Sequence, residues 1–580
     1  MNTDKISSDE GGLDDDSRRL RAAREKGAPA RLGTYVRLSG PGWLQSALTL
    51  GAGSLTGSLY LGVLAGFSML WLQPIALILG ISMLSAIGYV TISTDQRPFL
   101  AINEHINPAL GWGWALASLA ASIVWAMPQY ALANGVLQQN LIPGFLGPGS
   151  ALGEFNSKLI ISITVLAIAT TITWNYGRGG LSVRIYEFTL KILVAIIVVC
   201  FMGVVIRLGF ATQDLQWGEV LKGFIPNPAL LIRPADGFQP LLEAVPEISR
   251  AYWHDLIVAK QQDVMAAAVS SAVGINMTFL FGYSILRRGW GPEFSGLMKF
   301  DLVTGMLIPF ILATSCIMIA SATQFHTISQ PGLLENSDNR AFGEPAARQV
   351  AEYERLLTDL IAFQTGQAAQ GPAGPEVAQE TSGLGQEDRR MAATLVTRDA
   401  FDLANALRPF TGDFFSRVIF GIGVLAMALS SITLMMVISG FVICEMLNLP
   451  HTGWPFRFGS LAAATGVLGP FFWDQAYFWL AVPTSIFGLT LLPIAYMTFF
   501  LMMNQRSLLG QYMPTGRGRI TWNVLMGLAL VIIGSASVYM IASKAGAWGL
   551  AAILLFLATV VLVHLGKRRT RKRTSEVQAR

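Results

Sequence analysis

Apolar stretches alternate with short polar connections from about residue 40 to residue 566. The stretches repeatedly reach the ~20 residues that a helix needs to cross the hydrocarbon core of a bilayer. The pattern therefore predicts an all-α polytopic membrane protein with about twelve transmembrane helices. The predicted spans lie near residues 41–66, 68–93, 112–141, 158–176, 184–209, 260–286, 298–325, 415–447, 456–473, 477–503, 520–543 and 548–566.

The polar segments divide the chain into five regions. Residues 1–39 are polar and charged, which predicts a disordered cytoplasmic tail, and residues 40–325 hold the first seven spans. Residues 326–412 form a polar extracytoplasmic loop, and residues 413–566 hold the last five spans. Residues 567–580 form a basic cytoplasmic tail.

The loop of residues 326–412 has two distinct parts. Its middle, TGQAAQGPAGPEVAQETSGLGQ, is rich in Gly, Ala, Pro and Gln and is expected to be disordered. The segment before it, Gly343–Ala362, is predicted to be a surface helix whose charges form a solvated face. The second long outward connection, residues 210–259, is amphipathic.

Basic residues gather in alternate connections, which sets the orientation. With the N-terminus inside, the inward connections carry residues such as Arg97, Arg287 and Arg506, and the outward ones little beyond Lys158 and Lys544. The positive-inside rule then predicts that both termini are cytoplasmic. We expect the protein in the cell membrane, that is the inner or plasma membrane, as a multi-pass protein. The net charge of +5 lies mostly at the two ends, so the expected partner is the lipid bilayer and no nucleic acid.

Residues typical of catalysis or tight metal binding are sparse. The three cysteines, Cys200, Cys316 and Cys444, lie far apart in apolar runs, which indicates neither disulfides nor a metal cluster. The five histidines are scattered at helix ends and in loops. Hydrolase, zinc-protease, phosphate-loop and redox patterns do not occur with supporting context. We therefore expect neither an enzyme nor a cofactor.

The first apolar stretch, Gly40 to Phe67, has a centre poorly suited to a continuous helix. Glycines alternate there with small hydroxyl residues: Gly51, Gly53, Ser54, Thr56, Gly57 and Ser58. Each glycine costs a helix about 1 kcal/mol relative to alanine, and a weak centre within a span is typical of a discontinuous helix at a binding site. The same small residues also suit close packing of two membrane helices, so this stretch alone leaves both interpretations open.

The sixth span contains a second weak centre. Asn276 and Thr278 lie at mid-membrane depth, and Gly274 and Gly282 weaken the helix around them. Asn276 alone is equally explained by a hydrogen bond to a neighbouring helix. However, the first and sixth spans correspond if spans 1–5 and 6–10 form inverted repeats. Paired interruptions at corresponding positions indicate a transporter's substrate site near the membrane midplane.

Four segments carry a resemblance to a known family. GPGWLQSALTLGAGS aligns with an opening Gly-Pro-Gly that leads to an Asp-Pro-Gly-Asn metal motif, and INMTFLFGYS falls where Met-Pro-His-Asn-Leu-Tyr is usual. ALSSITLMMVISGFVICEML and LTLLPIAYMTFFLMMNQRSLLG resemble the eighth and tenth spans, including Glu445 and the Leu492–Pro493 pair. The chain thus resembles the Nramp family of proton-coupled divalent metal transporters. The resemblance implies a leucine-transporter-like fold of two inverted five-helix repeats with two extra helices.

The departures from this family are concentrated at its metal site. The motif residues Asp, Pro, Gly and Asn correspond here to Gly51, Ala52, Gly53 and Ser54. The ligand Met falls at Asn276, or at Met277 if the alignment shifts by one residue, and the His falls at Thr278. Gln129 and Leu132 replace acids that the family associates with its proton route. The predicted substrate site consists of seven residues: Gly51, Ala52, Gly53, Ser54, Asn276, Met277 and Thr278. Ser54 and Asn276 are expected nearest to a bound metal, and the metal ligands themselves are undetermined.

The donor types at these positions determine the functional expectation. A dehydrated divalent cation prefers carboxylate, and softer metals prefer sulfur, whereas these stretches supply mainly carbonyl, hydroxyl and amide oxygens. We expect an Nramp-like secondary transporter that moves a metal cation by alternating access at a carboxylate-free site. The alternatives are a transporter of the same fold for a small polar solute or monovalent cation, and a non-transporting membrane sensor or scaffold that uses residues 326–412. The coupling ion is unknown, because Glu187, Asp301 and Glu445 all lie near span ends.

Overall fold

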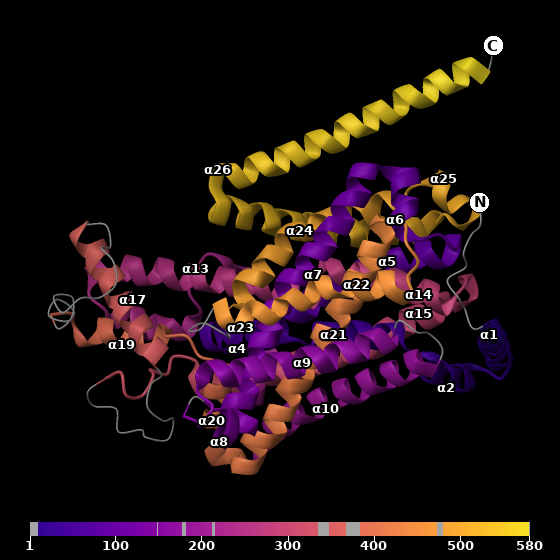
Figure 1. The fold of residues 1–580 in the computed structure, drawn as a ribbon. Coiled ribbons are helices and arrows are strands. Elements are labelled where there is room, and N and C mark those ends of the chain that lie inside the picture. Colours follow the sequence, from indigo (N-terminus) through magenta and orange to yellow (C-terminus); the bar gives the residue numbers. More distant parts are fainter. Residues whose placement is uncertain are drawn as a thin grey trace.

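The computed structural model describes residues 10–147, 149–176, 181–211, 215–334, 347–366, 383–472 and 480–578. Within these ranges the secondary structure is helical, without any strand, and most of the long helices lie side by side in one bundle (Figure 1). The all-α polytopic fold expected from the sequence is thereby confirmed.

Most of the predicted spans correspond to long helices. They are α3 (Pro41–Thr49), α4 (Ala52–Ala65), α5 (Leu72–Thr94), α7 (Pro108–Val136), α9 (Glu154–Tyr176), α10 (Leu181–Ala211), α13 (Glu247–Ala272), α14 (Ile275–Arg288), α16 (Ile308–Phe325), α21 (Phe420–Met446), α24 (Ala481–Met503) and α26 (Gly516–Gln578). Short helices precede or connect them: α6 (Pro98–Ala101), α8 (Pro143–Leu146), α11 (Trp217–Lys222), α12 (Gln239–Ala244), α15 (Ser295–Leu302), α22 (Gly453–Ala464), α23 (Gly469–Phe472) and α25 (Arg506–Leu509).

In the described part of the chain, nine helices are long and apolar enough to cross a membrane, or ten if the bent pair α3–α4 is one span. Two features account for the difference between these ten spans and the twelve predicted from the sequence. Gly546, with a φ of 55°, interrupts α26 and separates two apolar segments. The ninth predicted span consists of α22, the turn Thr465–Leu468 and α23, none of which is long enough alone. Each predicted range therefore contains helical structure.

The N-terminal region differs from the expected disordered tail. Residues Glu10–Glu25 form helix α1 and Ala28–Leu38 form α2. Leu20 and Leu38 are buried, and the Tyr35 ring lies 5.4 Å from the Phe300 ring of α15. Tertiary contacts thus stabilise helices that the charged composition alone does not indicate. Residues 1–9 lie outside the described ranges.

The long loop between α16 and α21 also contains more structure than expected. Helices α17 (Ala347–Thr365) and α19 (Gln386–Leu395) pack against α13, which begins at Glu247, and α20 (Ala400–Thr411) packs against α10 and α16 (Figure 1). We call these three helices the outer cap. Most of the Gly/Ala/Pro/Gln-rich middle of the loop, residues 367–382, lies outside the described ranges.

The solvated face predicted for α17 is present only in part: Glu354 and Arg355 are exposed, whereas Arg348 and Glu352 form ion pairs with other segments. Arg348 pairs with Asp399 at 2.5 Å and with Asp402 at 3.2 Å, both on the third cap segment. Glu352 pairs with Lys260 of α13 at 3.2 Å. These pairs join opposite charges that lie far apart in the sequence and meet only in the folded protein, Arg348 with the start of α20 and Glu352 with α13.

The start of the first span is held by a buried carboxylate. Asp301 of α15 accepts hydrogen bonds from the backbone N–H groups of Gly40, at 3.1 Å, and Gly42, at 2.6 Å. These N–H groups belong to the first turn of α3, where a negative charge is favourable. A side chain at Gly42 would overlap the Asp301 backbone, and one at Gly40 would overlap the Arg288 guanidinium. The two glycines of the sequence Gly40–Pro41–Gly42 are therefore needed for close packing against α14 and α15.

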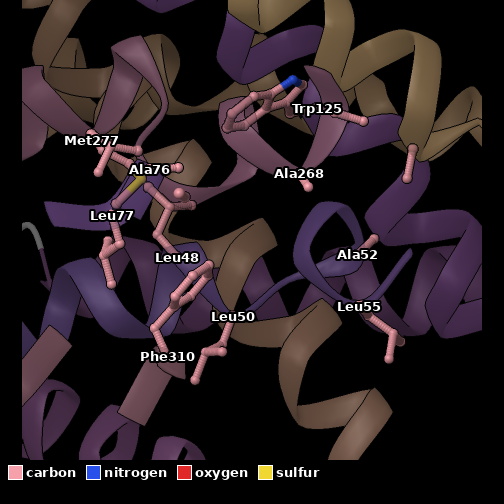
Figure 2. Close-up of a cluster of buried hydrophobic side chains, with 14 of the residues drawn as sticks. Leu48, Leu50, Ala52, Leu55, Ala76, Leu77, Trp125, Ala268, Met277 and Phe310 are labelled. Atoms are coloured by element: carbon pink, nitrogen blue, oxygen red, sulfur yellow. The ribbon is translucent and has the colours of Figure 1, made fainter. Parts of the chain in front are cut away.

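The hydrophobic core surrounds the break between α3 and α4. Figure 2 shows side chains from this segment together with others from neighbouring helices, namely Leu48, Leu50, Ala52, Leu55, Leu77, Trp125, Met277 and Phe310. These residues are buried. The interruption of the first span is thus enclosed on several sides by packed apolar groups, which leaves little room for water around the broken backbone.

Candidate functional site

The first span is interrupted where the sequence predicts it. Helices α3 and α4 meet at an angle of 54°, with Leu50 and Gly51 between them. Gly51 is extended (φ −129°, ψ −167°), so α4 begins at Ala52. The Ser54 hydroxyl accepts from the Gly51 N–H at 3.2 Å and donates to the Gly51 carbonyl at 3.0 Å. Ser54 thus caps its own helix. These hydrogen bonds offset part of the free-energy cost of leaving backbone groups unpaired where a helix breaks in an apolar setting.

Neighbouring helices satisfy further backbone groups at this break. The amide oxygen of Gln129, on α7, accepts from the Ala52 N–H at 2.9 Å. Two adjacent hydroxyls of α21 donate to the last turn of α3: Ser430 to the Ala47 carbonyl at 2.9 Å and Ser431 to the Leu48 carbonyl at 3.4 Å. The break between α3 and α4 is therefore stabilised by hydrogen bonds from two further helices, α7 and α21.

The second interruption separates α13 from α14. Val273 is extended (φ −144°) and Gly274 follows with φ −80° and ψ 157°. The Met277 sulfur accepts from the Gly274 N–H at 3.2 Å and from the Thr49 hydroxyl, on α3, at 3.5 Å. Met277 therefore connects the two interruptions directly.

The neighbouring predicted residues face a different helix. Asn276 donates to the Ser122 hydroxyl of α7 at 3.3 Å, and Trp114 of α7 donates to the Thr278 hydroxyl at 2.9 Å. The Oδ1 atom of Asn276 is buried and has no hydrogen-bond partner among the described residues. The structure thus brings Met277 to the first interruption, whereas Asn276 and Thr278 contact α7.

A small cavity lies beside the first break. It is lined by Leu48, Thr49, Gly51, Gly53, Ser54, Trp125, Pro128, Gln129, Ser271, Met435, Thr484 and Ser485. Its water-accessible space is about 20 Å³, roughly enough for one water molecule. Gly51, Gly53 and Ser54 are predicted site residues that line it, whereas Asn276 does not. The lining includes no carboxylate, and the described part of the chain holds no group of three or more His, Cys, Asp or Glu suited to a metal ion.

Three polar residues of the cavity were missed by sequence reasoning: Ser271 of α13 and Thr484 and Ser485 of α24. The only signal is a hydroxyl within an apolar span, and such hydroxyls commonly bond to their own helix. Ser271 does so, donating to the Ala268 carbonyl at 2.9 Å, and Thr484 donates to the Leu480 carbonyl at 2.9 Å. Their place in the cavity follows only from the packing of α13 and α24 against α4.

The structure has no room for a carboxylate side chain at the position of Gly51. A Cβ atom at this position would overlap the Ser431 hydroxyl and lie 3.1 Å from the Gln129 amide nitrogen. Leu132, the second residue at a position that the family resemblance associates with an acid, is buried within the apolar core. The surroundings of the first break are thus matched to a neutral, small residue.

Two interrupted helices that meet inside a bundle of membrane-spanning helices define a class of polytopic transporter folds. The chain matches the model of the family described as natural resistance-associated macrophage protein-like, Nramp, over residues 42–369 and 389–543. This match covers most of the chain, so the protein belongs to the Nramp family, as its sequence resemblance predicts.

Individual relatives agree with this assignment at different levels. The metal transporter Nramp2 of Populus trichocarpa is 36% identical over 111 residues, which is 19% of this chain and 20% of that relative. A mutant manganese transporter of Eremococcus coleocola has a TM-score of 0.60 at 14% identity, covering 93% of this chain and 96% of that one. The structure of the same transporter bound to an aromatic bis-isothiourea compound also has a TM-score of 0.60. Its identity is 15%, and the match covers 94% of this chain and 97% of that one. At such identities the structural likeness shows the shared fold.

Proposed function

We propose that this protein is a secondary transporter that moves a metal cation by alternating access, using a carboxylate-free site between its two interrupted helices. The family assignment supports transport of a metal, and metal and manganese transport are named for the relatives described above. The observation that carries the proposal is the direct contact between the two interruptions, in which the Thr49 hydroxyl donates to the Met277 sulfur.

The proposed site consists of the predicted residues of both interruptions. They are Gly51, Ala52, Gly53, Ser54, Asn276, Met277 and Thr278. Ser54 lines the cavity, and the unpartnered Oδ1 atom of Asn276 is free to accept from a ligand or to bind a cation. We propose these two side chains as the first candidates for cation contact, with Met277 as a sulfur donor between them.

The neutral character of this site determines which cations suit it. Removing a divalent ion from water costs a large desolvation free energy. Only a nearby opposite charge or an excellent set of ligands offsets that cost. The described cavity lining supplies hydroxyl, amide and thioether groups without a carboxylate. We therefore propose that the cation keeps part of its hydration shell and binds more weakly than at a site with an acidic ligand.

A flux experiment tests this proposal. Purified protein in liposomes is screened for uptake of divalent and monovalent cations, with and without an imposed proton gradient. We expect uptake of at least one metal cation, and manganese binding by titration calorimetry that is weaker than micromolar. Micromolar or tighter manganese binding at the core site would contradict the neutral-site proposal, and absence of uptake for every metal cation would contradict metal transport.

A second candidate function follows from the same neutral lining. A cavity of hydroxyl and amide groups also suits a monovalent cation or a small polar solute, because neither requires a carboxylate. Transport that needs no divalent ion would favour this alternative. A non-transporting sensor or scaffold is the third class. Loss of function after deletion of residues 326–412, with no effect of changes at Ser54 and Asn276, would favour it.

A further inference from the structure

A large cavity lies at the end of the bundle predicted to be extracytoplasmic, away from the candidate site. Its volume is about 890 Å³, within the range of pockets that hold small organic molecules. Its walls come from the end of α4, the connection between α10 and α13, and the end of α16. Among the described residues, none lines both this cavity and the one beside the first break. At a rise of 1.5 Å per residue, Ser54 and Gly66 lie about 18 Å apart along α4, so the two cavities are separate.

Gln324, near the end of α16, brings an unpaired amide to this outer cavity. The residue lines the cavity and is only 6% exposed. Its side-chain oxygen and nitrogen have no hydrogen-bond partner in the described part of the chain. A buried amide without a partner costs free energy, because it has given up hydrogen bonds to water. A molecule in the cavity that bonds to Gln324 removes that cost.

His326, directly after α16, presents a hydrogen-bond acceptor to the same cavity. Its Nδ1 atom lies 2.9 Å from the Val63 carbonyl, and since a carbonyl only accepts, Nδ1 carries the hydrogen. Burial lowers the pKa of His326, which favours the neutral ring, so Nε2 keeps its lone pair. Nε2 faces Gly237 of the cavity wall, where a Cβ atom would lie only 2.2 Å away. Glycine at this position therefore leaves the nitrogen uncovered.

The charged groups of the lining leave an excess of negative charge. Glu219 and Lys222 neutralise each other, with 2.7 Å between Oε1 and Nζ. Asp236 lies 3.8 Å from the Arg233 guanidinium, a long contact between exposed groups that contributes little. The Phe67 side chain also lines the cavity, and the face of an aromatic ring attracts cations. The lining therefore favours a cation that carries hydrogen-bond donors over an anion.

We propose that this outer cavity is a binding site for a small amine, an organic cation whose N–H and O–H donors pair with acceptors of the lining. The acceptors are the Asp236 carboxylate, the Gln324 amide oxygen and Nε2 of His326. Because the cavity lies at the end predicted to be extracytoplasmic, the amine enters from outside. Amine binding is independent of the proposed transport function, since it is measurable without transport.

Titration calorimetry of the full-length protein in detergent tests this site, with tyramine as the probe. The reference compound is the counterpart of tyramine in which a carboxylate replaces the amino group, because it keeps the ring and the hydroxyl but reverses the charge. We expect tyramine to bind at least about fivefold more tightly than this counterpart. Equal affinity of the two compounds, or no binding of tyramine, would overturn the proposal.

Variants of the lining locate the binding. Asp236→Asn should weaken tyramine binding about threefold and Gln324→Leu about threefold to tenfold, because each removes an interaction with a donor of the ligand. Gln324→Leu should not lower the melting temperature, since the amide makes no hydrogen bond that could be lost. Asp255→Asn and Gln139→Leu, at exposed positions outside the lining, are the matched controls and should bind like wild type. Wild-type binding in both lining variants would overturn the site. If Gln324→Leu does not fold, Asp236→Asn alone decides.

The outer site and the transport function fail in distinguishable ways. Ser54→Ala alters the proposed transport site and should leave tyramine binding unchanged. Absent metal uptake with intact tyramine binding would count against transport alone and support a separate outer site. Loss of tyramine binding in Ser54→Ala, with normal binding in Asp236→Asn, would place tyramine in the transport site and overturn the outer site.

Discussion

At the scale of single residues, Gly51 and Ser431 share one space between the α3–α4 turn and α21. A side chain at position 51 would overlap the Ser431 hydroxyl, which itself donates to the Leu48 carbonyl. The backbone of Gly51 is extended, so the restriction is one of space and not of backbone conformation. A charged ligand at position 51 therefore requires a smaller partner on α21.

This shared space leads to a prediction for metal affinity. The double change Gly51→Asp with Ser431→Ala should increase manganese affinity at least about tenfold, because it adds a carboxylate and makes room for it. Gly51→Asp alone should lower the melting temperature, since its side chain meets Ser431. Titration calorimetry and thermal melting of the three proteins measure both effects. Unchanged manganese affinity in the folded double variant would argue against a cation site at this break.

The hydroxyl of Ser54 and the amide of Asn276 provide a second residue-scale test. Ser54→Ala and Asn276→Ala should each reduce transport while leaving folding nearly intact, because one net hydrogen bond contributes only about 0.5–1.5 kcal/mol. Ser439→Ala is the control, since this buried serine donates to its own helix and does not line the cavity. Normal flux with a depressed melting temperature in both variants would show that these residues only hold helices together.

Close packing at the start of α3 predicts a strong effect of one methyl group. Gly42→Ala should destabilise the protein by about 1–3 kcal/mol, because its Cβ atom would overlap the Asp301 backbone. Gly33→Ala is the matched control, since no other atom lies within 4 Å of a Cβ at that position of α2. Its melting temperature should be unchanged or slightly raised. Equal melting temperatures for the two variants would contradict the close contact.

At the scale of elements, the outer cap depends on two carboxylates at the start of α20, of which Asp399 is buried and Asp402 is half-buried. Asp399 caps this helix by accepting from the Phe401 and Asp402 N–H groups, both at 2.8 Å. Asp402 accepts from the Asp399 N–H at 2.8 Å and from the Arg348 guanidinium. Burial, and secondly the charge of Asp399, raise the pKa of Asp402 from 3.8 to about 7.

The sign of this shift predicts how the cap responds to pH. Because the pKa of Asp402 is higher in the folded cap, the stability from its protonated form is present below about pH 4 and is lost as the pH rises to about 7. Hydrogen-exchange protection of α20 should fall about tenfold over this interval, after correction for the intrinsic exchange rate. Asp402→Asn should remove most of this dependence, whereas Asp255→Asn, at an exposed position on α13, should not. An equal dependence in Asp402→Asn would contradict the assignment.

At the scale of the whole molecule, the orientation in the membrane remains a prediction from the basic connections. Gln386, at the start of α19, is exposed on the outer cap, and Gly518, near the start of α26, is exposed at the end that bears the basic connections. In a cysteine-free background, Gln386→Cys should react with an impermeant maleimide in intact cells, and Gly518→Cys only after permeabilisation. Ser337→Cys should behave like Gln386→Cys. The reverse pattern would reject the proposed topology.

The sequence by itself determined the helical class, the membrane spans and the position of both interruptions. This is possible because the bilayer sets the length and apolarity of a span, and because glycine weakens a helix wherever it stands. Gly51 and Gly274 both lie at observed breaks. The family was also identifiable from short motifs.

Only the tertiary structure decided which side chains meet. The direct link between Met277 and Thr49, the hydrogen bond from Ala52 to Gln129, and the place of Ser485 in the cavity all join residues far apart in the chain. A one-residue difference on a helix rotates a side chain by about 100°, so Asn276 and Met277 face different helices although the sequence treats them as neighbours. The helices of the N-terminal region and the outer cap likewise depend on contacts across the fold. Their local composition favours solvent, and burial against α13 and α15 reverses that preference.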